Sequence, residues 1–104
     1  MCASCHTESR TAADAVGPNL WGVVLRRVAS SPSFAYSPSL AKLSSSRWGF
    51  EALNKFLKQP TGYAPGTYMT FSGLTEASTR MDVLRYLNLL SPRPLDVGRF
   101  RFKP

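Results

Sequence analysis

The sequence predicts an all-α fold in which a few short helices are joined by long loops. Two segments carry apolar residues at the spacing of one helix face, and no segment alternates between apolar and polar residues as a strand would. The stretch 17–47 is rich in Gly, Pro, Ser and Asn and shows neither period. Because loops this long are uncommon in a compact domain, we expect a buried cofactor to organise them.

The first predicted helix spans residues 50–58. Its apolar residues share one face: Phe50, Leu53, Phe56 and Leu57. The dipeptide Gln59-Pro60 ends the pattern, because proline lacks an amide donor and restricts the residue before it.

The second predicted helix spans residues 76–90, with Thr75 as its N-cap and Glu76 in its first turn. Its predicted apolar face consists of Met81, Val83, Leu84, Leu87 and Leu90. Between the two helices, Pro65-Gly66 marks a turn.

Length and composition exclude several classes of protein. A chain of 104 residues is long enough for one small domain. Its longest apolar runs, such as Val23-Val24-Leu25, fall far short of the roughly 20 residues of a membrane-spanning helix. Two cysteines, three positions apart, cannot form the disulfide framework of a small secreted domain.

The net charge of +7 raises the question of nucleic-acid binding. The basic residues are scattered singly apart from Arg26-Arg27 and a cluster in the last twelve residues. No basic helix or Lys/Arg-rich run is present, so we expect no nucleic-acid partner. A mildly basic face suits an acidic protein partner better.

The strongest motif is Cys2-Ala3-Ser4-Cys5-His6, the C-x-x-C-H pattern of covalent c-type haem attachment. Two thiols on one tight helical turn are spaced to add to the two vinyl groups of a haem. The adjacent imidazole then lies under the iron as an axial ligand.

Other readings of this motif remain open at this point. A zinc site requires four ligands, and the chain offers only Cys2, Cys5 and His6, all at one end. A redox dithiol belongs near a βαβ pattern, which the sequence lacks. His6 alone would also suit an ordinary surface position.

A six-coordinate haem needs a second axial ligand, and with a single His in the chain the candidate is a methionine sulfur. Met1 is the first residue, and Met81 lies in the second predicted helix, where packing is its expected role. Met69 follows the Pro65-Gly66 turn between Tyr68 and Phe71, whose rings are expected to shield it from water. We therefore expect Met69 to be the ligand.

The sequence strongly resembles the class I cytochromes c, especially the bacterial cytochrome c2 and c550 group and their mitochondrial relatives. The likeness covers about residues 2–90 and rests on an ordered series of segments. They are Cys2-Ala-Ser-Cys-His6, Gly17-Pro-Asn-Leu-Trp-Gly22, Phe34-Ala-Tyr36, Trp48, Phe56-Leu57 followed by Pro60, Tyr63-Ala-Pro-Gly-Thr-Tyr-Met69, Phe71, and Arg80 through Tyr86-Leu87.

The resemblance implies a single haem c, held by thioether links at Cys2 and Cys5, with His6 and Met69 as axial iron ligands. It implies further haem contacts at Pro18, Leu20, Arg26, Tyr36, Trp48, Phe56 and Phe71. Among these, the Pro18 carbonyl would accept the imidazole N–H. Tyr36 and Trp48 would donate to a buried haem propionate near the Arg26 cation, because a buried carboxylate is costly without donors and a positive charge.

The sequence departs from the family pattern in several places. Family members have a helix before the haem motif that packs on the final helix, so we expect part of the face around Leu84, Tyr86 and Leu87 to be exposed here. Leu25, Ser30 and Ser33 stand where the family has glycines, and each adds strain if its backbone requires positive φ. Phe56 replaces a common tyrosine. We expect a haem domain at residues 1–90 and a mobile, basic extension at 91–104.

The resemblance implies a soluble, monomeric one-electron carrier rather than an enzyme. We expect Arg10, Arg27, Lys55 and Lys58 to favour docking with acidic redox partners, such as an oxidase, a reductase or a reaction centre. The expected compartment is the periplasm, or the mitochondrial intermembrane space in a eukaryote, although no signal segment precedes Cys2. The alternatives are the haem domain of a larger oxidase or dehydrogenase, and a weak peroxidase if Met69 dissociates.

Overall fold

A computed structural model describes residues 2–96 of the chain. Over these residues it contains helices and one isolated β-bridge, between Arg27 and Arg47, and no strand. The helices are η1 (Cys2–Ser4, a 3-10 turn), α1 (Pro38–Ala41), α2 (Phe50–Lys58), α3 (Pro60–Tyr63) and α4 (Ala77–Leu89). The predicted all-α class is therefore confirmed.

Helix α2 has the predicted bounds, 50–58. Leu53, Phe56 and Leu57 are buried, as the apolar period indicates, and the basic residues of its last turn suit the negative end of the helix dipole. The proline that ends this helix also begins the next one, which was not predicted. Pro60 is the first residue of α3, where its missing N–H is not needed and its fixed φ suits the helix.

Helix α4 begins one residue later and ends one residue earlier than predicted. The predicted cap was wrong: Glu76, in an extended conformation, is the N-cap, and its side chain makes no capping bond. The Arg80 amide bonds to the Glu76 carbonyl as part of the first helical turn, while the Thr75 carbonyl is occupied by the Arg80 guanidinium. The inward face combines the predicted Leu84 and Leu87 with two polar residues, Arg80 and Asn88.

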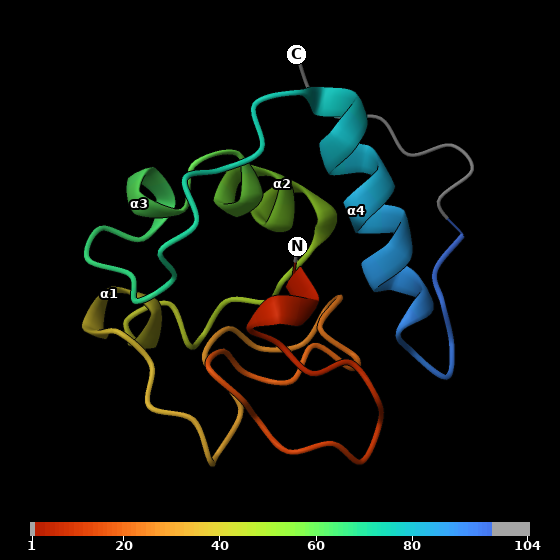
Figure 1. Ribbon diagram of the computed structural model, residues 1–104, viewed down its shortest axis with the longest axis horizontal. Helices are drawn as coiled ribbons and strands as arrows, with labels where there is room; N and C mark the ends of the chain where they lie inside the picture. The colour runs from red at the N-terminus through yellow and green to blue at the C-terminus, as the bar shows by residue number, and fades with distance from the viewer. Residues whose placement is uncertain (1, 97–104) are drawn as a thin grey trace.

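Figure 1 shows α4 along one side of the molecule, α1 and α3 on the opposite side, and α2 between them. Helix α2 packs against both α3 and α4. The buried apolar residues come from these helices and from the loops around Val23, Val28 and Trp48. The long amino-terminal loops fill the rest of the molecule, with η1 near the centre of the view (Figure 1).

The stretch 17–47 is mostly loop, as predicted, but it includes the single turn α1. Ser37 caps this turn by accepting a hydrogen bond from the Leu40 amide, and Pro38 occupies its first position. A pair of backbone hydrogen bonds, Leu25 N to Trp48 O and Trp48 N to Arg26 O, fastens this stretch to the start of α2.

Within residues 2–96, two non-glycine residues adopt the left-handed conformation. Leu25, at φ 67°, is one of the three positions where we expected strain. Ser30 and Ser33 do not have positive φ, so the condition for strain is not met there, whereas Ala29, which was not considered, is left-handed at φ 57°. A left-handed residue with a Cβ costs about 1–2 kcal/mol.

The outer face of α4 is partly apolar. Tyr86 and Leu89 are 52% and 65% exposed, whereas Leu84 and Leu87 are buried in the core. The expected exposure of this helix therefore holds for Tyr86 and was wrong for Leu84 and Leu87. Beyond α4, the backbone of Leu95 makes a reciprocal pair of hydrogen bonds with the Asn88 side chain. The rest of the predicted mobile extension, from residue 97, lies outside the described residues.

Candidate functional site

The described residues enclose a mainly apolar cavity of about 390 Å³, a size typical of a small-molecule or cofactor site. Its wall contains every residue that the sequence analysis assigned to the site. These are Cys2, Cys5, His6, Pro18, Leu20, Arg26, Tyr36, Trp48, Phe56, Met69 and Phe71. Segments far apart in the sequence thus meet at one place.

The cysteines reach the cavity from the turn η1. The amides of Cys5 and His6 both donate to the Cys2 carbonyl, at 3.1 and 2.9 Å, which closes the turn. The two thiols are not joined to each other. Burial raises the pKa of the half-buried Cys2 thiol, so it is protonated at neutral pH.

The imidazole of His6 is held by the backbone of Pro18, which also lines the cavity. Its Nδ1 lies 2.7 Å from the Pro18 carbonyl oxygen. A carbonyl only accepts, so Nδ1 carries the proton in this contact and Nε2 keeps its lone pair. This arrangement suits a neutral imidazole that binds a metal ion through Nε2.

Gly17 allows the imidazole to lie where it does. A Cβ on this residue would stand 2.4 Å from Cε1 of His6, a distance that real side chains do not show. The Gly17 amide also donates to the Cys5 carbonyl at 2.8 Å. Gly17 is therefore part of the site, although sequence reasoning did not assign it there.

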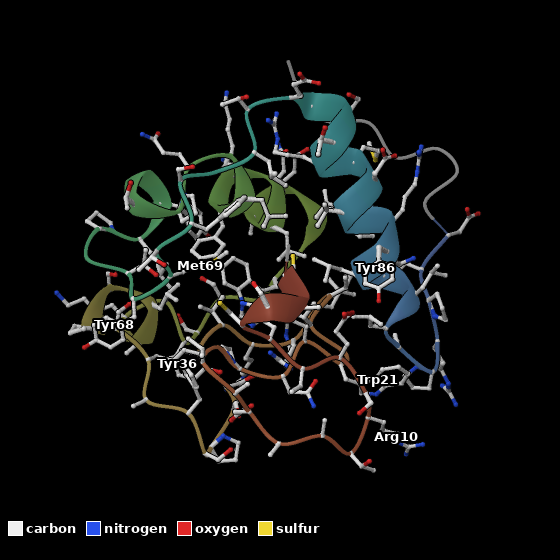
Figure 2. All side chains as sticks on the ribbon, in the orientation of Figure 1. Arg10, Trp21, Tyr36, Tyr68, Met69 and Tyr86 are labelled. Carbon is white, nitrogen blue, oxygen red and sulfur yellow. The ribbon has the colours of Figure 1, made fainter. Side chains whose placement is uncertain are left out.

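Met69 lies on the loop between α3 and α4 and is partly buried against the core. Figure 2 shows it on the opposite side of η1 from Tyr86 of α4. Its side chain lines the cavity, and Met81 does not. The neighbouring Tyr68 also lines the cavity but is 63% exposed, so it shields the thioether less than we expected.

The segment after Met69 is held in place by Arg80, whose side chain is buried. Its Nε donates to Asn54 Oδ1 at 2.6 Å, and its Nη1 donates to the carbonyls of Leu74 and Thr75 at 2.8 and 2.9 Å. One guanidinium thus links the returning loop to α2 and α4. The five fixed donors of arginine suit this role, which a lysine could not fill.

The same loop returns to α2 at Gly73. The Leu74 amide donates to the Leu57 carbonyl at 2.7 Å. Gly73 has φ 117°, and a Cβ there would stand 2.2 Å from the Lys58 carbonyl oxygen. Only glycine permits this approach.

One part of the cavity wall is polar. Arg26 donates from Nη1 to the carbonyls of Asn19 and Trp21, at 2.9 and 3.1 Å. Its partial burial lowers the pKa of the guanidinium, which remains protonated at physiological pH. Tyr36 lies close enough to interact with this charge, and Trp48 lines the same cavity. The rings of Trp48 and Phe56 pack with their centroids 5.2 Å apart.

No family model matches the chain. It is 43% identical over 97 residues to a cytochrome c homolog of Bradyrhizobium diazoefficiens, covering 90% of this chain and 52% of that protein. It is 38% identical over 86 residues to a cytochrome c homolog of Rickettsia conorii, covering 83% and 49%. It is also 38% identical over 86 residues to the cytochrome c of Euglena viridis, covering 83% and 82%.

The chain belongs to the cytochrome c family. It spans about half the length of the two bacterial relatives and most of the Euglena protein. Cytochromes c carry a covalently bound haem c and are electron-transfer proteins rather than enzymes. None of the helices within residues 2–96 has the length and apolar character needed to cross a membrane.

The residues around the cavity fit a haem. The thiols of Cys2 and Cys5 are not joined in a disulfide, and with Nδ1 bonded to the Pro18 carbonyl a neutral His6 would have Nε2 available for a metal ion. A thioether lines the same cavity, and histidine with methionine is a known axial pair in cytochromes c. The apolar wall suits the macrocycle, and the cationic corner at Arg26 suits its carboxylates.

Sequence reasoning missed three residues that shape this site: Gly17, Gly73 and Arg80. Their signals were present but ambiguous. Gly17 precedes Pro18, and Gly73 ends the segment after Phe71, so both looked like ordinary turn glycines. Arg80 lies on the inward face of α4, where a charged residue is rarely buried without partners.

Proposed function

We propose that this chain is a one-electron carrier in which thioether links at Cys2 and Cys5 hold the haem, and His6 and Met69 are the axial iron ligands. One observation carries the proposal. The imidazole held by the Pro18 carbonyl and the thioether of Met69 lie on the wall of the same cavity, although more than half the chain separates them.

The protein's part in this chemistry is to hold two ligands in place. The Pro18 carbonyl fixes the orientation of the imidazole and makes Nε2 a stronger ligand. The contacts of Arg80 hold the segment that carries Met69. The haem supplies the one-electron couple of its iron, and thioether ligation favours a high reduction potential. With both axial positions filled by the protein, no position is left for a substrate.

The rest of the wall controls water and charge. Leu20, Phe56 and Phe71 exclude water from the faces of the cofactor. Arg26, Tyr36 and Trp48 are placed to stabilise a buried carboxylate by charge and by hydrogen bonding. These roles agree with the local chemistry, because Tyr36 lies close enough to interact with the Arg26 cation and all three residues line the cavity.

The proposed partners are acidic redox proteins. Arg10, Arg27, Lys55 and Lys58 are exposed, and the chain carries a net charge of +7. Such charges raise the rate of association with an acidic surface, and the rate falls as salt concentration rises. The carrier is proposed to act as a monomer in the bacterial periplasm, or in the mitochondrial intermembrane space if the protein is eukaryotic, where c-type haem is attached.

The function is tested by expressing the chain with a haem-attachment system and measuring its mass and a redox titration. The expected result is one covalent haem, with a reversible one-electron wave. A correctly exported chain that folds without covalent haem would contradict the proposal.

The ligand assignment is tested by comparing Met69→Ala with Met81→Ala. Met69→Ala is expected to lower the midpoint potential and to abolish the weak far-red band of an iron–thioether bond, because the soft ligand is lost. Met81→Ala is the matched control, since Met81 does not line the cavity, and it is expected to retain both. If Met81→Ala alone has these effects, the assignment is wrong. Rapid peroxide turnover by the unchanged protein, with no far-red band, would favour the peroxidase alternative instead.

A further inference from the structure

A carboxylate outside the cavity wall connects two loops that are distant in sequence. Asp14 Oδ2 accepts hydrogen bonds from the hydroxyls of Ser31 and Ser33, each at 2.7 Å. Its Oδ1 accepts from the Asn19 amide at 2.8 Å. The hydroxyl of Ser33 and the other donors hold the pKa of the Asp14 carboxyl below its usual range, so this group is ionised at neutral pH.

Ser31 connects this carboxylate to the cavity. While its hydroxyl donates to Asp14, its backbone amide donates to the Tyr36 hydroxyl oxygen at 3.0 Å. Tyr36 lines the cavity, and Figure 2 shows it on the same side of η1 as Met69. A path of two hydrogen bonds therefore runs from Asp14, through a single residue, to a side chain of the proposed haem site.

The contact with Ser31 determines what the Tyr36 hydroxyl can do. A phenol has one proton and accepts through its oxygen. The Ser31 amide uses an acceptor position, so the proton remains available for donation. Within residues 2–96 the structure gives this proton no protein acceptor. It is therefore free to serve a carboxylate held in the cavity.

The loop that carries Ser31 needs an external attachment. Ala29, two residues earlier, has the left-handed φ of 57°. A strained residue of this kind persists only when surrounding contacts determine the conformation. The two serine contacts to Asp14 are such contacts, and they hold the loop from outside the cavity wall.

We propose that Asp14 is a positioning residue for the haem site: through Ser31 it fixes the Tyr36 hydroxyl so that its proton is directed to a haem carboxylate. This inference rests on the proposed function. Loss of the directed hydrogen bond leaves more negative charge uncompensated near the iron, which favours the ferric form. Breaking the connection therefore lowers the midpoint potential.

The test compares Ser31→Ala with Ser33→Ala in the haem-bearing protein. Both variants remove one hydroxyl from the same carboxylate and leave the net charge unchanged, but only Ser31 also contacts Tyr36. Ser31→Ala is expected to lower the midpoint potential, and Ser33→Ala to leave it within error. Equal shifts in the two variants would overturn the proposal, because they would indicate a general loosening of the loop.

Asp14 itself is tested by a cycle with Tyr36→Phe. Asp14→Ala also removes a negative charge, which by itself raises the potential in any background. The difference between its effect with Tyr36 present and with Phe at this position isolates the part that acts through the hydroxyl. We expect Asp14→Ala to raise the midpoint potential less in the protein with Tyr36 than in the Tyr36→Phe background. The Phe background shows the effect of charge removal alone. Identical effects in both backgrounds would overturn the proposal.

Hydrogen exchange of the Ser31 amide provides a readout that does not depend on the iron. In Asp14→Ala this amide is expected to exchange about fivefold to tenfold faster, as for the loss of one ordinary hydrogen bond. Unchanged exchange would overturn the proposal. Failure of the proposed function is distinct from these outcomes, since it would appear as wild-type protein without covalent haem, whereas failure of this inference leaves a normal redox wave.

Discussion

The two walls of the cavity that supply the proposed iron ligands are built differently. On the His6 wall, the ligand side chain itself makes a hydrogen bond of 2.7 Å, and a glycine lies directly against its ring. On the Met69 wall, the backbone amide of Met69 donates to Thr67 at 3.3 Å, and the main attachment is the distant guanidinium of Arg80. The His6 wall is fixed at the ligand, and the Met69 wall is fixed through its loop.

Backbone strain follows the same division. In the part of the chain that the structure describes, two residues with a Cβ adopt left-handed angles, Leu25 and Ala29, and both belong to the amino-terminal loops. On the segment that carries Met69, the positive angles belong to Gly66 and Gly73. The amino-terminal loops contain left-handed residues that surrounding contacts must hold in place, whereas the segment that carries Met69 uses glycine where φ is positive. If Met69 binds the iron as proposed, that bond is expected to break before the His6 bond when the protein is destabilised.

The largest expected effect comes from Gly17→Ala, which places a methyl group against the His6 ring. The added methyl would stand 2.4 Å from the imidazole carbon, so the ring must leave its position or the backbone must shift. Overpacking of this kind costs about 1–3 kcal/mol, and here it also displaces a proposed ligand. The expected result is loss of the low-spin spectrum and a lower yield of covalent haem.

Gly49→Ala is the control for this substitution. A Cβ on Gly49 meets no atom within 4 Å, although the residue is the N-cap of α2. A loss of about 1 kcal/mol in stability with unchanged haem ligation is expected, because alanine is a poorer N-cap than glycine but no atom near the haem site is displaced. A low-spin spectrum in Gly17→Ala equal to that of the control would show that the His6 wall can shift to accept the methyl group, and the prediction would be wrong.

A smaller effect is expected from Arg80→Lys, which loosens the Met69 wall and leaves the His6 wall intact. Lysine keeps the charge but cannot reach Asn54 and two carbonyls in a fixed fork. We expect a loss of about 2 kcal/mol in the free energy of unfolding, since hydrogen bonds to charged groups contribute about 1.5–3 kcal/mol. In a denaturant titration the far-red thioether band is expected to disappear before the imidazole ligation does.

Arg85→Lys is the matched control, because Arg85 lies on the same helix with an exposed side chain. Its unfolding free energy is expected to stay within about 0.5 kcal/mol of wild type. If Arg80→Lys lost both ligands at the same denaturant concentration, the two walls would not differ in strength, and the comparison would fail.

The sequence predicted best what depends on local pattern. Helix α2 has its predicted bounds because a clear apolar period ends at Gln59-Pro60. Every residue that the motifs and the resemblance placed at the site lies on the cavity wall, and its role toward a haem stays a prediction. The cap of α4 was misassigned because Thr75 and Glu76 both resemble helix starts, and the pattern does not show that the Arg80 side chain, five positions on, occupies the Thr75 carbonyl.

The features that were not predicted depend on contacts between distant segments. Asp14 meets Ser31 and Ser33 across 17 and 19 positions, with no local period to signal the approach. The backbone angles of the loops also depend on contacts between distant segments. Leu25, Ser30 and Ser33 looked equally in need of glycine, and only the folded loop shows that Leu25 alone among them is left-handed. The sequence shows which loop positions are candidates for a left-handed backbone, and the packing of the folded loops determines which of them adopt it.

The smallest expected effect tests the backbone strain of the amino-terminal loops. Leu25→Gly removes about 1–2 kcal/mol of left-handed strain, partly offset by about 0.4–1 kcal/mol from the greater freedom of glycine in the unfolded chain. Leu25 is 46% exposed, so the loss of buried apolar area is limited. We expect a net stabilisation of less than about 1 kcal/mol, measured from guanidinium unfolding of the haem-bearing protein. Ser30→Gly, at a residue with ordinary backbone angles, is the matched control and should destabilise by about 0.4–1 kcal/mol. If both variants lowered the unfolding midpoint equally, the backbone at Leu25 would not be strained. The proposed difference in backbone strain between the amino-terminal loops and the Met69 segment would then fail at this position.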